Sequence, residues 1–315
     1  MKNYGIIGFK DANVDNFTSD TGIKLRRVIH PVLRRVLRLA VKGDLIIDRY
    51  PTLEKDKPYI FVSLHNFLED TIANLATIDR STYLLFGTTN QLELNKEMYA
   101  AWLNGFIYVD RENVENRRDA IKKMERVLTS GSSVLIFPEG GFNNTENLLC
   151  QKLFASPFIL SHLTGIEVVP IAPFYQFGSD KIYMNVGDPI DLCKFDDKKE
   201  ALMYLRDTLA SMAYENYLKH AKRVLRSELG DDPRLDYMEE RRCEYLKSKW
   251  SRDVWDEELT RYLDSEDKEM ESVLSSMDDI KITKHNAYIM KPIIERRSED
   301  KKYDFKKYMH ENWNK

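Results

Sequence analysis

Short apolar runs alternate with longer amphipathic stretches between residue 44 and about residue 220. The runs are rich in Val, Ile, Leu, Tyr and Phe, which is the composition of buried strands. They lie at 45–48, 59–64, 83–86, 106–109, 134–137, 168–172 and 182–186. Apolar residues at helical spacing occupy 69–78, 94–103, 114–129, 150–164 and 198–219. Strands that alternate with such helices predict an α/β fold, with a mostly parallel sheet flanked by helices.

A basic amphipathic helix is predicted ahead of the first strand, at residues 22–43. Its apolar positions fall on one stripe, which comprises Leu25, Val28, Ile29, Val32, Val36, Leu39 and Ala40. Pro31 favours a kink, and Gly43 is a plausible stop. Residues 21–42 contain seven bases and no acid. Such a helix suits either a membrane interface, with its cations at anionic headgroups, or packing on the protein with a solvated basic face.

The C-terminal third of the chain has a different composition. Residues 221–315 hold 21 bases and 23 acids, together with aromatic anchors such as Trp250 and Trp255. We interpret this stretch as a charged helical extension without evident chemistry. The predicted organisation is therefore a polar segment at 1–21, the basic helix at 22–43, an α/β domain at 44–220 and the extension at 221–315.

Composition excludes several classes of protein. The 315 residues are 43% hydrophobic and carry a net charge of −3, so a packed core is expected and nothing indicates a nucleic-acid partner. No run of 18 apolar residues predicts a spanning helix. The cysteines, Cys150, Cys193 and Cys243, are far apart, which fits a reducing cytosol and argues against a zinc site. The G-x-S-x-G, G-x-x-x-x-G-K-[ST], G-x-G-x-x-G and H-E-x-x-H motifs are absent.

His65 stands at the end of the strongly apolar run 59–64, where ligands bind in parallel sheets. Asp70 follows five residues later, at the start of a helical pattern. If the chain folds back between strand and helix, the carboxylate can fix the imidazole tautomer and leave the other nitrogen as a general base. Glu69 competes with Asp70 for this role on spacing alone. A structural His with a capping acid is the simpler alternative.

Two further segments place polar residues directly after a run. Residues 137–141 read Phe-Pro-Glu-Gly-Gly, and the two glycines allow the backbone to approach a ligand closely. Residues 105–111 end in Asp110 and Arg111, where the guanidinium suits a phosphate. The structural alternative for the first segment is an ordinary turn with a solvated Glu139. For the second segment it is an Asp110–Arg111 pair that caps the strand.

These segments occur in an order that resembles the glycerolipid acyltransferase family, which includes the 1-acylglycerol-3-phosphate acyltransferases. His65 to Asp70 is similar to the H-x-x-x-x-D motif of the family, and 105–111 to its second block. Phe137 to Gly140 matches the F-P-E-G block, and 168–173 resembles the fourth block with its V-P-[IV] sequence. The resemblance covers residues 44–190 and implies an α/β acyltransferase domain.

The resemblance also implies a reaction. His65 and Asp70 would be catalytic, and Arg111, Glu139, Gly140 and Gly141 would bind substrate. The donor would be an acyl thioester of CoA or carrier protein, the acceptor a lysophosphatidate-like lipid or lysophospholipid, and the pathway phospholipid biosynthesis. No metal and no cofactor are expected. A zinc site of His65, Asp70 and His162 is a remote alternative.

Two departures from the family pattern leave the acceptor open. The F-P-E-G block of the family usually continues with Thr or Ser and then often Arg, whereas here it continues with Gly141 and Phe142. Phe67 replaces the small polar residue that the family often has two positions after the His. A glycolipid acceptor, a thioesterase-like hydrolysis and a non-catalytic lipid-binding protein therefore stay as alternatives. A lipid acceptor also favours the membrane interpretation of residues 22–42. We expect a cytoplasmic protein that is peripheral on the inner face of a membrane.

Overall fold

The computed structural model describes residues 18–67, 69–87, 103–109, 113–143, 148–176 and 179–221, together with Ile282, Thr283 and Ala287. The chain divides into two compact units, Met1–Lys249 and Trp250–Lys315. In the second unit, the N–H of Ala287 donates to the carbonyl oxygen of Thr283. Most of the predicted helix at 94–103 and of the predicted extension at 221–315 lies outside the described residues.

The first unit contains a seven-stranded sheet whose order is β1-β7-β6-β2-β5-β3-β4. All seven predicted runs are strands: β1 (Asp44–Arg49), β2 (Ile60–Ser63), β3 (Thr82–Gly87), β4 (Phe106–Val109), β5 (Ser133–Ile136), β6 (Val168–Gln176) and β7 (Lys181–Val186). Strands β6, β2, β5, β3 and β4 run parallel to one another. Strand β7 is antiparallel to β6 and parallel to β1, so β1 and β7, at one edge of the sheet, run opposite to the other five strands. The predicted α/β fold with a mostly parallel sheet is confirmed.

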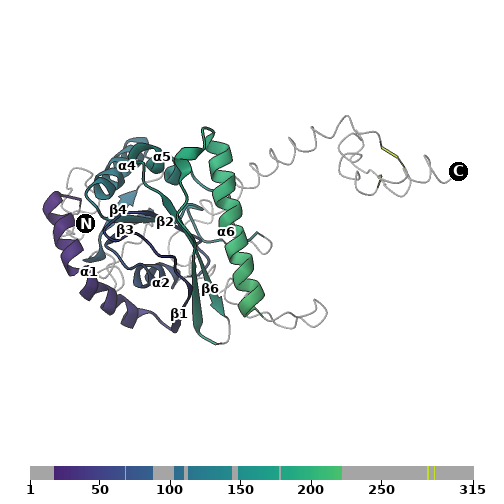
Figure 1. The fold of residues 1–315 in the computed structure, drawn as a ribbon, viewed down its shortest axis with the longest axis horizontal. Helices are drawn as coiled ribbons and strands as arrows, with labels where there is room; N and C mark the ends of the chain where they lie inside the picture. The colour runs from purple at the N-terminus through teal and green to yellow at the C-terminus, as the bar shows by residue number, and fades with distance from the viewer. Residues whose placement is uncertain are drawn as a thin grey trace, which may run out of the picture. The chain divides into compact units, whose positions relative to one another are not determined.

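Helices cover both faces of this sheet (Figure 1). Side chains of α4 (Val114–Thr129), α5 (Ser156–Thr164) and α6 (Lys198–His220) share one core cluster with Ile60 and Val62 of β2. Side chains of α1 (Asp20–Ala40) and α2 (Asp70–Thr77) share the other cluster with Phe61. Neighbouring strand residues thus point to opposite faces, and both faces are buried, which is why the strands read as continuous apolar runs.

Helix α5 is shorter than the apolar spacing predicts. The pattern indicates a helix from residue 150, but α5 begins at Ser156, with Pro157 in its first turn. The preceding residues are held by the turn after β5 instead, because the N–H of Gln151 donates to Glu139 and the N–H of Phe154 donates to the Pro138 carbonyl oxygen. These long-range hydrogen bonds replace the helical ones that periodicity alone suggests.

Helix α1 lies against the domain through a different face from the predicted stripe. It begins at Asp20, and the hydroxyl of the N-cap residue Ser19 accepts the Gly22 N–H. It ends at Ala40, three residues before the predicted end. Its buried residues are Ile23, His30, Leu33 and Leu37. Burial, reinforced by the charge of Arg34, lowers the pKa of His30 to about 4, so its buried imidazole is neutral at pH 7.

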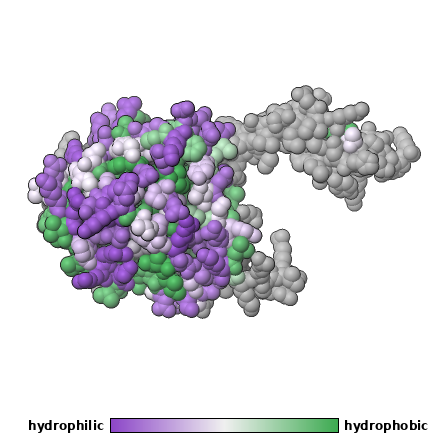
Figure 2. All heavy atoms as spheres, viewed as in Figure 1, coloured by the Kyte–Doolittle hydropathy of each residue, from purple (hydrophilic) through white to green (hydrophobic). Residues whose placement is uncertain are grey.

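The predicted apolar stripe of α1 is largely on the surface. Val28 is 77% exposed and Leu39 88% exposed, and the exposed apolar side chains of the helix are Leu25, Val28, Val32, Val36 and Leu39. We call these five residues the outer stripe. Figure 2 shows apolar side chains among polar ones at the edge of the molecule where α1 runs (left). Of the helices in the described ranges, none is both long and apolar enough to cross a bilayer.

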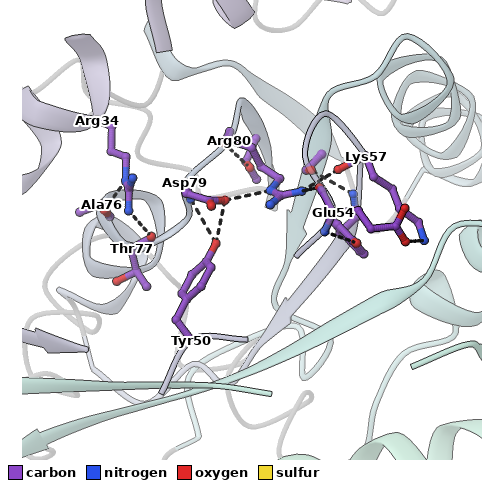
Figure 3. Close-up of polar contacts among 11 residues, drawn as sticks. Arg34, Tyr50, Glu54, Lys57, Ala76, Thr77, Asp79 and Arg80 are labelled. Atoms are coloured by element: carbon purple, nitrogen blue, oxygen red, sulfur yellow. Dashed lines mark hydrogen bonds and ion pairs between the residues drawn. The ribbon is translucent and has the colours of Figure 1, made fainter. Parts of the chain in front are cut away.

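Arginines of α1 hold the C-terminal end of α2 (Figure 3). Nε of Arg34 donates to the Ala76 carbonyl oxygen at 3.1 Å, and one of its terminal nitrogens donates to the Thr77 carbonyl oxygen at 2.7 Å. Arg38 adds a hydrogen bond to Ala76 at 3.2 Å. The last carbonyls of a helix lack intrahelical partners and carry partial negative charge, so a guanidinium stabilises them. The N-terminal helix is therefore fastened to α2 by polar contacts as well as by its apolar face.

Substitution of Arg34 by alanine should destabilise the folded domain. Removal of two charge-assisted hydrogen bonds to helix-terminal carbonyls is expected to lower the free energy of unfolding by about 1–3 kcal/mol. Chemical denaturation of the purified variant measures this loss. Arg35→Ala is the matched control, because the neighbouring Arg35 is exposed and its loss should cost less than about 0.5 kcal/mol. Equal stability of the two variants would contradict this interpretation of α1.

Candidate active site

The candidate site lies where two neighbouring strands end. Strand β2 pairs in parallel with β5, so the segments after Ser63 and after Ile136 leave the sheet at the same edge. The first segment carries His65 and the second carries residues 137–143. A backbone hydrogen bond from the Asn143 N–H to the His65 carbonyl oxygen, at 2.7 Å, joins the two segments directly. The structure thus brings His65 and the F-P-E-G turn together.

His65 pairs with Asp70. The imidazole Nδ1 lies 3.0 Å from both carboxylate oxygens of Asp70, the first residue of α2. Glu69, the other candidate, occupies the position before the helix and makes no capping hydrogen bond with its side chain. The chain does fold back between the strand and the helix, so the acid five residues after His65 reaches the imidazole.

The Asp70 carboxylate is fully buried, and several donors surround it. Besides the imidazole, its Oδ2 accepts the backbone N–H groups of Asn66 at 2.8 Å and Phe67 at 3.2 Å. Asn74 closes the same bend, because its side-chain amide donates to Ser63 Oγ and to the Asp70 carbonyl oxygen. A buried carboxylate is costly unless such donors satisfy it, and these donors supply its hydrogen bonds.

This pairing sets the tautomer of His65. An ionised carboxylate accepts but cannot donate, so Nδ1 carries the proton and Nε2 has a free lone pair. No residue in the described ranges hydrogen-bonds to Nε2, and the side chain is 17% exposed. A neutral imidazole with one nitrogen bound to a buried carboxylate and the other open has the arrangement of a general base.

Glu139 holds the turn after β5 against the strand end of β2. One of its carboxyl oxygens accepts the Gln151 N–H at 2.7 Å, and the other accepts the His65 N–H at 3.3 Å. Its side chain is buried, with the residue only 1% exposed. Burial raises the pKa of Glu139 to about 7, although the two N–H groups oppose the shift. The geometry thus ties Glu139 to the backbone of His65, and its predicted contact with a substrate stays a prediction.

The two glycines of the turn have different surroundings. Gly140 adopts φ +77°, which strains a larger residue, and a Cβ at this position would lie 2.4 Å from the ring of Phe154 and would displace it. At Gly141, no heavy atom of the described residues, apart from its two chain neighbours, lies within 4 Å of the position that a Cβ would take. The backbone of Gly141 is therefore approachable by another molecule from that side, as its predicted role in substrate binding requires.

Two aromatic rings cover the faces of the His65 imidazole. The ring centroid of Phe137 is 4.2 Å from that of His65, with 24° between the planes. The ring of Phe142 is 3.7 Å away, with 29° between the planes. Sequence reasoning did not identify Phe142 as a site residue, since only its departure from the family pattern drew attention to it. Phe67, the other departure, is buried instead, 5.6 Å from Tyr175 between ring centroids.

The remaining candidates are Arg111, Asp110 and His162. Arg111 and Asp110 lie outside the described residues, so the predicted contact of Arg111 with a substrate stays a prediction. His162 lies on α5, where its Nδ1 contacts the Phe158 carbonyl oxygen at 3.1 Å. Within the described part of the chain, no group of three or more His, Cys, Asp or Glu side chains is arranged to hold a metal ion.

The part of the chain that contains this site is similar to known acyltransferases. Residues 45–173 match the family model of the acyltransferases, described as "Acyltransferase". The 1-acyl-sn-glycerol-3-phosphate acyltransferase of Chlamydomonas reinhardtii is 28% identical over 128 residues, which are 40% of this chain and 37% of that protein. The match therefore spans little more than a third of the relative. The family resemblance predicted from the four motifs is confirmed over this region.

A solved structure is also similar. It is the crystal structure of the 1-acyl-sn-glycerophosphate (LPA) acyltransferase PlsC from Thermotoga maritima. The similarity has a TM-score of 0.48 and 16% sequence identity, and it covers 61% of this chain and 82% of PlsC.

The raised pKa of Glu139 predicts a measurable pH dependence of stability. The native state holds this proton more tightly than the unfolded state, so stability falls as the pH rises from about 4.5 to about 7. The contribution of this group is on the order of 3 kcal/mol. Denaturation at several pH values should show a flatter profile for Glu139→Gln than for the unchanged protein. Glu115→Gln, an exposed control on α4, should keep the original slope. Identical profiles for all three proteins would contradict the buried, proton-binding role.

Proposed function

We propose that the protein is an O-acyltransferase that moves a fatty acyl group from an acyl thioester to the free hydroxyl of a lysolipid. The observation that carries the proposal is the His65–Asp70 pair, with Nδ1 bound to a buried carboxylate and Nε2 open, inside an acyltransferase-family domain. The acceptor that we propose is lysophosphatidate or a similar lysophospholipid, in agreement with the activity named for the Chlamydomonas relative. The product belongs to phospholipid biosynthesis.

The geometry supports a reaction without a covalent enzyme intermediate. Nε2 of His65 takes the proton of the acceptor hydroxyl while the hydroxyl oxygen bonds to the thioester carbonyl carbon. The tetrahedral species then breaks its C–S bond, and the departing thiolate takes the proton from the imidazolium. Asp70 stabilises the imidazolium between these two steps and keeps its proton on Nδ1. The chemistry requires no metal or cofactor, and the thioester of CoA or carrier protein is a substrate.

We assign substrate contacts to the turn after β5. Gly141 supports this assignment, because its backbone faces open space beside the segment that holds His65. Gly140 keeps the turn in a conformation that a larger residue would disturb. The assignment of Arg111 and Glu139 to acceptor binding rests on the family motif alone, and Glu139 also supports the His65 backbone.

We further propose that the protein works on the cytoplasmic surface of a membrane and binds anionic lipid through the outer stripe of α1. The stripe is apolar and exposed, whereas the opposite face of the helix is buried in the protein. At about 100° per residue, the exposed cations Lys24 and Arg35 follow one border of the stripe. An apolar strip bordered by cations matches the boundary between acyl chains and anionic headgroups.

Loss of the base should abolish acyl transfer. We expect His65→Ala to lower kcat at least about 1,000-fold, within the range attributed to a general base, and Asp70→Asn to lower it about 100-fold or more. The assay is transfer from a labelled long-chain acyl-CoA to lysophosphatidate, with a panel of other lysolipids in parallel.

His162→Ala is the matched control, because this histidine lies on α5 with a contact to Phe158 and should leave kcat unchanged. Full activity of His65→Ala would show that the assigned base is wrong. Release of free fatty acid at the same rate with no acceptor present would favour a thioesterase, whereas acyl transfer to a glycolipid alone would change the acceptor class.

Polar substitutions in the outer stripe should weaken membrane binding without unfolding the protein. The double variant Val28→Ser and Val32→Ser removes two of its exposed apolar side chains. We expect at least about a tenfold loss of affinity for vesicles that contain anionic lipid, since each buried apolar side chain contributes about 1–2 kcal/mol. Co-sedimentation with the vesicles measures the affinity.

The control carries the same change on another helix. Met203→Ser and Leu218→Ser replace two exposed apolar side chains of α6 and should leave vesicle binding intact. Deletion of α1 is a poorer test, because the deletion would also expose the core that Leu33 and Leu37 cover. Equal binding of the α1 and α6 variants would exclude the outer stripe as the membrane contact.

A further inference from the structure

The stacking of Phe142 on His65 is built into the fold. The next residue, Asn143, donates its backbone N–H to the His65 carbonyl oxygen at 2.7 Å. The Asn143 side chain is itself held, because its amide nitrogen donates to Leu148 and its oxygen accepts from Gln151. Phe142 therefore lies between the approachable Gly141 and a residue that is anchored to the base. Its position over the imidazole is set by these three hydrogen bonds of the next residue, Asn143.

The two rings constrain the imidazole in a direction that Asp70 does not. The hydrogen bonds to Asp70 hold one edge of the ring, through Nδ1. Phe137 and Phe142 cover its two faces, at centroid distances of 4.2 Å and 3.7 Å. Rotation of the imidazole about its bond to Cβ would drive its edge into one of these rings. The rings thus keep Nε2 directed away from Asp70.

The same contacts favour the charged form of the base. An aromatic face carries a negative quadrupole, so it attracts a cation stacked over it, more strongly when water is excluded. The imidazole acquires positive charge when it takes a proton, and the Asp70 and Glu139 carboxyls are the titratable groups that contact this residue. The rings add an interaction that grows as this charge develops, which is the condition for lowering a barrier rather than only binding a substrate.

We infer that Phe142 is a positioning residue of the acyl transfer, which acts by stacking on the His65 imidazole and stabilising its protonated form. The inference rests on the proposed function, because it assigns His65 the role of the base. It adds a requirement that the His65–Asp70 pair alone does not impose, namely an aromatic ring at position 142.

The test replaces the ring and keeps the bulk. We expect Phe142→Leu and Phe142→Met to lower kcat about tenfold, as for the loss of one desolvated aromatic–cation contact, with the KM for both substrates within about twofold. Phe142→Tyr keeps the aromatic face and should retain kcat. In proton NMR spectra, the His65 ring signals, identified by their loss in His65→Ala, should move downfield in the Leu and Met variants because one ring current is gone.

Phe158→Leu is the matched control, since it removes a ring 4.0 Å from another histidine, His162, outside the site. It should leave kcat and the His65 signals unchanged. Unaltered kcat in Phe142→Leu, or an equal loss in Phe142→Tyr, would overturn the inference. If the unchanged protein transferred no acyl group, that result would instead refute the proposed function. The NMR signals would still decide whether Phe142 orients His65. His65 signals that do not move in either variant would overturn the positioning role.

Discussion

Burial of the Asp70 carboxylate is the constraint on which the arrangement of the site depends. A charge removed from water is costly unless donors replace the lost hydration. The donors here are the His65 imidazole and the N–H groups of Asn66 and Phe67, all from the bend that follows β2. The chain bends around the first turn of α2 to supply these donors, and Nε2 of the imidazole is then directed away from Asp70. The contacts that make this bend stable are therefore the ones that orient the proposed proton acceptor.

Two carboxyl groups contact His65, and their surroundings give them different character. Asp70 is surrounded by donors that suit an ionised group, whereas burial brings the pKa of Glu139 to about 7. The Cys150 thiol beside Glu139 is also kept protonated, because burial and the nearby carboxyl raise its pKa. The imidazole thus contacts the Asp70 carboxylate at Nδ1, while the backbone N–H of His65 contacts a Glu139 carboxyl that is about half ionised at pH 7.

Much of this arrangement could be predicted from the sequence. The seven strands were visible because both faces of a parallel sheet are buried, which produces continuous apolar runs. Spacing alone left Glu69 and Asp70 equal, since adjacent residues differ only in the direction in which the helix presents them, and the family motif was needed to choose Asp70. The contact of Phe142 with His65 was hidden for another reason: it depends on hydrogen bonds between two loops far apart in the chain. The buried face of α1 was missed because it includes His30 and lies among arginines, so it does not form an apolar stripe in the sequence.

Helix α1 is already folded before it meets any lipid. Many interfacial peptides are coils in water and become helical only on a bilayer, so part of their binding free energy is lost to ordering the backbone. Here Leu33, Leu37 and the arginine contacts to α2 order the helix within the protein. In the proposed membrane contact, the five apolar side chains of the outer stripe would then need no further ordering of the helix. A preformed helix would also fix the tilt at which the domain meets a bilayer surface, so that the proposed attachment would be oriented as well as reversible.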